Sequence, residues 1–394
     1  RDVERSRGLG DVYKRQDSNY MDDIFAQKLK AFSNPAFSSE DQKKLCTYHH
    51  KLILTEVIPA YQELADSLES LRGTGKSSRG LAFFEGGREY YLYLLQSQTG
   101  TYVPVGQIEK RLSAQLLSDY REISSLLKQN SSLIDRLNQC SGELTLTPTQ
   151  MLEKLPELMK KDFPELKDAT YELRTVHPSM KKFLSPAFYL TPPVDTRTPN
   201  VIYINDSGHT SSLELFGTLA HEGFPGHLYQ TVSFAENNPS DIRYLVTSSG
   251  YVEGWATYVE SYGYEYAASL MNDPDSAKNA VRLAWLNRSM NLCIYSLIDI
   301  GIHYRGWDAA RTAVFLKAFG INNASTAAEI YQYIVETPGN YLKYYWGYLN
   351  FLDLKTVCQK RLGDDFDLKE FHRRILDIGP VQFPVLEKYM KQWN

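Results

Sequence analysis

The chain has 394 residues, of which 43% are hydrophobic and 23% charged, and its formal net charge at pH 7 is −4. A chain of this length can form two or three domains or one large helical body, and its mild acidity provides no basic surface for binding nucleic acid. The sequence has no run of about 18 apolar residues, so we expect no membrane span. The four cysteines are far apart and predict neither a disulfide framework nor a thiolate metal site.

The N-terminal end of the chain divides into three parts. Residues 1–16 are polar, show no clear amphipathic period and do not begin with Met, so we expect a non-native or disordered leader. Residues 17–72 carry helical patterns and predict an N-terminal helical segment, with a break at Asn34 and Pro35. The polar, glycine-rich residues 73–80 predict a linker to one large domain at residues 81–394.

Residues 81–394 carry mostly helical patterns, which predict a mainly α fold, a large helical body with a small β element. The capping box of Thr147 and Gln150, with Pro148 in the first turn, predicts a helix start. Residues 165–176 fit either a strand or a helix end, and residues 201–205 form the clearest strand. Helical patterns occupy residues 106–129, 211–236, 240–271, 275–305, 307–319, 325–335, 339–362 and 367–375.

Two histidines bracket a carboxylate in the segment His221-Glu222-Gly223-Phe224-Pro225-Gly226-His227. Many hydrolytic zinc sites use two His and one Glu as ligands and leave one coordination position open for water. In the usual arrangement the two His are four residues apart on one helix face, and a Glu beside the first is the general base. Here the spacing is six residues, which on a continuous helix would place the imidazoles about 120° apart.

Pro225 and Gly226 occupy the interval between these histidines. Proline lacks the N–H that would bond the carbonyl of His221, and glycine tolerates the unusual dihedrals of a bulge. We therefore predict a helix that opens by two residues and brings both imidazoles to one side, because such bulges often lie at functional sites. The alternative is a chance His-Glu pair near another His, with a Pro-Gly step that merely ends a helix.

Glu253 is the expected third ligand, 26 residues after His227, which is far enough for a second helix to return antiparallel. Residues 244–271 predict that helix, with Glu253 and Glu260 on a different face from the packed aromatic residues. Glu260 would orient an imidazole N–H. The alternatives for Glu260 are a solvated helix charge or a ligand that replaces Glu253. The packed face would carry Tyr251, Trp255, Tyr258 and Tyr262.

Together, residues 221–227 and 251–260 resemble the bacterial domain-of-unknown-function family 885, and the resemblance covers most of the chain. Within residues 338–347, which resemble a further motif of the family, Asn340 stands where the family has Gln. The resemblance implies a gluzincin-like metallopeptidase fold, with residues 81–394 as the catalytic domain and two His and a distal Glu on one zinc ion. Further stretches similar to the family's motifs are residues 86–91, 189–205, 299–307, 338–347 and 371–380.

The same motifs contain further candidate site residues. Tyr344 could donate a hydrogen bond to the oxyanion as a carbonyl is attacked, or it could be one more core tyrosine. His303 could contact substrate or hold the tetrahedral intermediate, with a packed histidine as the alternative. Arg197, Tyr203 and Asn205 are candidate substrate contacts, because a peptide can add to the exposed edge of a strand such as 201–205. A purely structural strand is the alternative there.

These patterns predict a zinc-dependent hydrolase that cleaves peptide bonds, with short peptides as the expected substrates and one Zn²⁺ held by His221, His227 and Glu253. Glu222 is the expected general base, which takes a proton from a zinc-activated water and passes it to the leaving amine. A zinc amidase or esterase, and a catalytically inactive binding or scaffold protein of peptidase descent, are the alternatives. The family resemblance favours the bacterial envelope or export, with the cytoplasm as the alternative.

Overall fold

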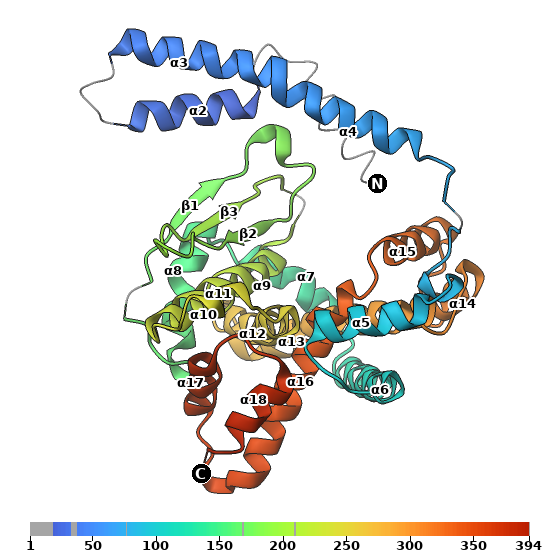
Figure 1. The fold of residues 1–394 in the computed structure, drawn as a ribbon. Coiled ribbons are helices and arrows are strands. Elements are labelled where there is room, and N and C mark those ends of the chain that lie inside the picture. Colours follow the sequence, from blue (N-terminus) through green and yellow to red (C-terminus); the bar gives the residue numbers. More distant parts are fainter. Residues whose placement is uncertain (1–18, 33–37, 76, 168, 209, 394) are drawn as a thin grey trace. The chain divides into compact units, whose positions relative to one another are not determined.

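The computed structural model describes residues 19–32, 38–75, 77–167, 169–208 and 210–393 (Figure 1). The expected leader at residues 1–16 and the break at Asn34 and Pro35 lie outside the described residues. The described chain is mainly helical with one small sheet, which confirms the predicted mainly α fold. It divides into two compact units, residues 1–76 with 176–185, and residues 77–175 with 186–394. None of the described helices is long and apolar enough to cross a bilayer.

In the N-terminal unit, one carboxylate joins the first two helices. Asp22 bonds the Nδ1 atoms of both His49 and His50 at 2.8 Å, so it ties the first helix to the second. Segment 176–185 belongs to this unit, although no local pattern in the sequence indicates it. The elements are α2 (Tyr20–Ala31), α3 (Ser39–Leu52), a π-helical turn (Ile53–Val57), α4 (Ile58–Ser70) and a 3₁₀ turn (Pro178–Met180).

The second unit contains the remaining helices and the sheet. Its helices are α5 (Gly87–Thr99), α6 (Val105–Gln129), α7 (Leu133–Glu143), α8 (Pro148–Leu158), α9 (Ser212–Glu222), α10 (His227–Glu236), α11 (Ile242–Leu245), α12 (Ser249–Ala268), α13 (Pro274–His303), α14 (Ala309–Lys317), α15 (Ala324–Glu336), α16 (Asn340–Leu362), α17 (Leu368–Ile378) and α18 (Phe383–Met390), with 3₁₀ turns at Leu81–Phe83, Met159–Lys161 and Gly363–Asp365. The capping box of Thr147 and Gln150 begins α8, as predicted. Helices α5, α7 and α18 were not predicted, and the single helix expected at 240–271 is divided into α11 and α12.

Three short strands form a sheet in the order β1-β3-β2. The central strand β3 (Val201–Ile204) pairs in parallel with β1 (Glu172–Thr175) and antiparallel with β2 (Ala187–Leu190). The strand predicted at 201–205 therefore has both edges occupied, and the hypothesis that a peptide adds to it is wrong. Strand β2 lies at an edge of the sheet and packs against α9, the helix that carries the first histidine of the candidate site.

Helix α12 lies in the core of the second unit and packs against α16 (Figure 1). A β-carbon at Gly254 would lie 2.4 Å from the carbonyl carbon of Gly347, so the two backbones can approach this closely only with glycine. The crossing brings Glu253 on α12 within 3.9 Å of Lys343 on α16. The aromatic face predicted for α12 is buried, and it consists of Tyr251, Trp255, Tyr258 and Tyr262.

Candidate metal centre

The helix that carries the first histidine ends before the second histidine is reached. Helix α9 ends at Glu222 and helix α10 begins at His227. The residues between them leave helical geometry, with ψ of −97° at Gly223 and −135° at Gly226, and the Phe224–Pro225 peptide bond is cis. The predicted two-residue opening within one helix is therefore a complete break between two helices.

A glycine and one hydrogen bond define this break. A β-carbon at Gly226 would lie 1.8 Å from the carbonyl oxygen of His221, so the turn has room only for glycine. The carbonyl oxygen of Pro225 accepts a hydrogen bond of 2.9 Å from the indole N–H of Trp255 on α12. Helix α12, which carries Glu253, is thereby bonded directly to the segment that joins the two histidines.

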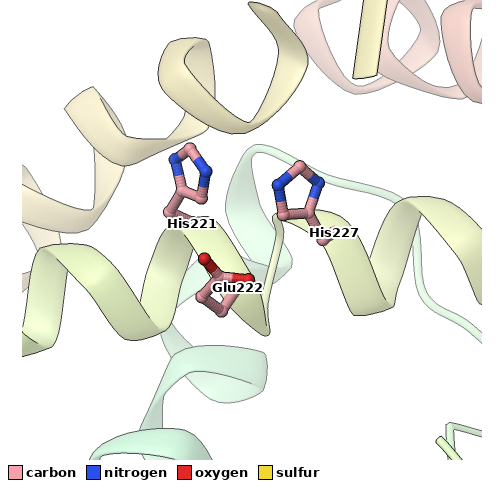
Figure 2. Close-up of side chains that lie close together, drawn as sticks. All are labelled: His221, Glu222 and His227. Carbon is pink, nitrogen blue, oxygen red and sulfur yellow. The ribbon is translucent and has the colours of Figure 1, made fainter. Parts of the chain in front are cut away.

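The break allows both imidazoles to point toward the same space. Figure 2 shows the rings of His221 and His227 beside each other, with the Glu222 side chain nearby. Their centroids are 4.8 Å apart and the ring planes are perpendicular. Among the described residues, His221, Glu222 and His227 form the group whose potential ligand atoms all lie within 4.8 Å of one another.

Glu253 completes a set of three donors around this space. Its Oε2 atom lies 3.8 Å from Nε2 of His221 and 3.5 Å from Nε2 of His227. Donors about 2.1 Å from a tetrahedral zinc ion are about 3.4 Å from one another, so these separations fit a shared ion. Glu222 is the acid whose potential ligand atoms group with both histidines, and Glu253 is the acid with one oxygen close to both Nε2 atoms, which makes Glu253 the candidate third ligand.

The charges around His221 favour a cation in this space. Burial opposes protonation of His221, but the close carboxylates of Glu253 and Glu260, with the charge of Glu222, raise its pKa to about 10. Burial likewise disfavours a charged Glu253, yet its contacts with His221 and His227 hold the pKa of this carboxyl below its ordinary value. A divalent cation would satisfy the same carboxylates and leave the imidazoles neutral, as metal ligands must be.

Glu260 lies behind His221, on the opposite side of the ring from Glu253. Its Oε2 atom is 3.4 Å from Nδ1 of His221, an ion-pair contact without the alignment of a hydrogen bond. Its Oε1 atom accepts a bond of 3.0 Å from Arg288. Glu260 is only 5% exposed, so it is not a solvated helix charge. This placement suits an acid that orients the imidazole, and does not suit a ligand in place of Glu253.

Glu222 is fixed by the edge strand of the sheet. Its Oε2 atom accepts a hydrogen bond of 2.9 Å from the backbone N–H of Tyr189 on β2. The described residues place no bond on its other carboxylate oxygen. One oxygen of Glu222 is therefore anchored, and the second can take part in proton transfer beside the two histidines.

Helix α16 adds two side chains to the site. The ring centroid of Tyr344 lies 6.4 Å from that of His221. Burial raises the pKa of Tyr344, and the neighbouring carboxylates of Glu253 and Glu222 raise it further, so the phenol remains a donor. Lys343 was not predicted, and its Nζ atom lies 3.9 Å from Oε1 of Glu253. The only signal for Lys343 in the sequence was its position beside Tyr344.

His303 is not a member of the site. It is completely buried, and its Nδ1 atom accepts a bond of 3.1 Å from the backbone N–H of Leu81. Its Nε2 atom is 2.8 Å from the carbonyl oxygen of Ile334, to which it donates. Both ring nitrogens are thus used by backbone groups, and burial lowers the pKa of His303 to about 4. His303 is therefore a packed structural histidine, because its one N–H is used and no donor remains for an oxyanion.

The three predicted substrate contacts lie on or near the sheet. Tyr203 is on the central strand and stacks on Phe188, with ring centroids 5.1 Å apart. Asn205 is buried, and its backbone N–H bonds the carbonyl of Pro186 at 2.8 Å. Arg197 lies on the loop between β2 and β3. These contacts belong to the sheet and its loops, and they do not bring the three residues to the histidine pair.

Comparison with known proteins identifies the family of the chain and solved structures with a similar fold. The model of the family described as "Bacterial protein of unknown function (DUF885)" matches residues 3–390. The solved structure of "the putative lipoprotein from Colwellia psychrerythraea" is similar with a TM-score of 0.77 and 21% identity, covering 94% of this chain. The chain spans 66% of that protein's length.

A second solved structure has the same fold. It is "a putative lipoprotein of unknown function from Shewanella oneidensis", with a TM-score of 0.65 and 17% identity. The similarity covers 99% of this chain and 72% of the other. No match was found among curated proteins.

Proposed function

The chain belongs to the DUF885 family of bacterial proteins, and from this premise we propose that it is a zinc-dependent hydrolase that cleaves peptide bonds. One observation carries the proposal. A single oxygen of Glu253 lies within 3.8 Å of the Nε2 atoms of both His221 and His227, at separations that suit tetrahedral coordination. The gluzincin-like character of the fold is part of the same proposal.

Each side chain of the site has a separate role in the proposed reaction. A zinc ion held by His221, His227 and Glu253 would supply Lewis acidity for the attack of water on a carbonyl. Glu222 accepts a proton from the attacking water and returns it to the leaving amine, while the N–H of Tyr189 fixes its orientation. The phenol of Tyr344 donates to the oxygen that becomes negative as the carbonyl is attacked. Glu260 orients His221.

The location of the protein is part of the proposal as well. The two similar structures carry lipoprotein descriptions. These descriptions support an envelope or exported location for this chain. A peptide substrate suits such a location, because peptides and proteins are present on the outer side of the membrane.

Zinc titration of the metal-free protein tests the proposal directly. We expect one zinc ion to bind per chain and the variants His221→Ala, His227→Ala and Glu253→Ala each to weaken binding strongly. The matched control is Glu265→Ala, which changes an exposed carboxylate on the same helix as Glu253. Anomalous diffraction at the zinc edge should place the ion between the two imidazoles.

A peptide library assayed with the zinc-loaded protein tests the reaction. Cleavage that depends on zinc and on Glu222 supports a peptidase. Zinc binding with hydrolysis of ester or amide probes alone would favour the amidase or esterase alternative. A protein that binds no zinc and cleaves nothing would favour the binding or scaffold alternative.

A further inference from the structure

A hollow of about 220 Å³ lies between helix α10 and the loop that joins β2 to β3. Thr231 and Ala235 of α10 line it, and they follow His227 by one and about two helical turns. Residues four apart lie on the same side of a helix, so the hollow continues the face that carries His227. The rise along the helix places these lining residues about 6 and 12 Å from His227.

Arg197 is the only charged residue among the described residues that line the hollow. Its guanidinium contacts neutral groups at long range, the carbonyl oxygen of Ala235 at 3.5 Å and Oδ1 of Asn238 at 3.4 Å. In the described chain it forms no ion pair with a carboxylate. A guanidinium is always charged and offers five donors in a planar fork, so most of its capacity to bind a carboxylate remains unused.

Two further observations concern Arg197 and its neighbour Tyr244, which both line the hollow. Arg197 has a φ of +55°, a left-handed conformation that is uncommon for residues with a side chain and that is often kept at binding sites. Its guanidinium lies 5.3 Å from the ring centroid of Tyr244. The hydroxyl of Tyr244 is buried and has no hydrogen-bond partner in the described chain, which is unfavourable for a polar group.

One side chain connects the hollow to the proposed metal site. The backbone N–H of Tyr189 bonds Glu222, and its hydroxyl donates to Oδ1 of Asn200 at 2.7 Å. Asn200 lines the hollow. Tyr189 on β2 therefore contacts both Glu222 and a residue at the end of the loop that carries Arg197.

Resting on the proposed peptidase function, we propose that the hollow beside Arg197 binds the C-terminal carboxylate of a short peptide that is cut at the metal site. An extended peptide spans about 3.3–3.6 Å per residue. The distance along α10 therefore corresponds to about two or three residues between the cleaved bond and the free carboxylate. The enzyme would release dipeptides or tripeptides from the C-terminal end of its substrates.

Binding to a hydrolysis-deficient protein tests the pocket apart from the reaction. The probes are acetyl-pentaalanine with a free carboxylate and its C-terminal amide, titrated calorimetrically into zinc-loaded Glu222→Gln protein. We expect the acid to bind roughly 10- to 100-fold more tightly than the amide, since charged hydrogen bonds are stronger than neutral ones. Adding Arg197→Gln should remove this preference, so that the acid and the amide bind with similar affinity.

Two variants control this experiment. Arg197→Lys keeps the charge but loses the planar fork, so it should retain part of the preference. Arg121→Gln removes an exposed arginine from α6 and should retain the whole preference. Thermal unfolding of Arg197→Gln confirms that the variant is folded, and Arg197→Lys serves as the test if it is not.

The outcomes separate the pocket from the reaction. Equal binding of acid and amide, or a preference that survives Arg197→Gln, would overturn the carboxylate site even if zinc-dependent cleavage is found. A preference that depends on Arg197 without any hydrolysis of the acid by the wild-type protein would leave the pocket in place and overturn the peptidase function. Release of alanine dipeptides or tripeptides from the acid supports both.

Discussion

The indole N–H of Trp255 donates a hydrogen bond of 2.9 Å to the carbonyl oxygen of Pro225 in the interior of the protein. Trp255 lies two residues after Glu253, and Pro225 lies two residues before His227. One buried bond therefore joins the helix that carries the proposed acid ligand to the break between the two histidines.

Loss of the Trp255 bond should weaken both the fold and the metal site. In Trp255→Phe the carbonyl of Pro225 would remain buried without its donor, at a cost of about 1–3 kcal/mol in unfolding free energy. Zinc affinity should fall too, because His227 follows this carbonyl by two residues. Chemical denaturation and zinc titration measure the two effects.

Trp346→Phe is the matched control for this change. Trp346 is also buried, but its indole N–H has no hydrogen-bond partner in the described chain. Both substitutions remove similar volume, so the difference between them isolates the bond to Pro225. Equal losses of stability and of zinc affinity in the two variants would contradict the role given to Trp255.

Glu222→Gln should separate metal binding from catalysis. The amide can no longer accept the proton of the attacking water, so we expect kcat to fall by roughly 10²- to 10⁴-fold. Zinc affinity should remain close to that of the wild type, because the three proposed ligands are intact. Steady-state kinetics with a cleaved peptide and zinc titration measure both quantities, and Glu265→Gln on α12 is the exposed control. Full activity of Glu222→Gln would exclude it as the general base.

Gly226→Ala should disrupt the break between α9 and α10. The added β-carbon would lie 1.8 Å from the carbonyl oxygen of His221 and 2.4 Å from that of Ala220, so backbone must move. We expect a clear loss of stability and of zinc affinity, since backbone atoms cannot rotate away as a side chain can. Gly106→Ala is the control, because a β-carbon at Gly106 in α6 has no heavy atom within 4 Å.

The control should behave in the opposite way. Alanine is the better helix former and Gly106 lies in the first turn of α6, so Gly106→Ala is expected to raise the unfolding free energy by at most roughly 0.5–1 kcal/mol. Unchanged zinc binding in Gly226→Ala would show that the turn tolerates a side chain and that the histidine pair does not depend on it.

His372 should make the protein less stable in mild acid. Its Nδ1 atom lies 2.7 Å from the carbonyl oxygen of Asp162 and its Nε2 atom 2.8 Å from the hydroxyl of Tyr258. Burial lowers the pKa of His372 to about 3, against about 6.5 in an unfolded chain. Between these values the unfolded chain binds a proton that the folded chain does not. The stability contributed by the neutral ring is therefore present above about pH 6.5 and is lost as the pH falls toward 3.

Denaturation of metal-free His372→Gln and wild-type protein between about pH 7 and pH 4.5 measures this effect. The wild-type unfolding free energy should decline over this interval, and that of the variant should start lower and decline less steeply. Parallel declines would mean that His372 is not responsible for the acid sensitivity of the fold. The metal-free form is used so that loss of zinc at low pH does not contribute.

The periodic and local features of this protein could be predicted well. The capping box of Thr147 and Gln150, the helix at 106–129 and the buried aromatic face of α12 follow from patterns within a few residues. Such patterns act through short-range contacts that the order of residues already specifies. The division of helix 240–271 and the helices α5, α7 and α18 were missed, because packing partners far away in the sequence decide where these elements begin and end.

The sequence by itself determined the mainly helical fold and the residue types of the candidate site, because His221, Glu222, His227 and Glu253 supply imidazole and carboxylate groups whatever the packing. The tertiary structure decided the rest. In the structure, a complete break separates α9 from α10 where a bulge was predicted, and strand 201–204 lies at the centre of the sheet. Both ring nitrogens of His303 bond backbone groups, and Lys343 lies close to Glu253. These outcomes depend on which distant segments pack together, and no local pattern specifies that packing.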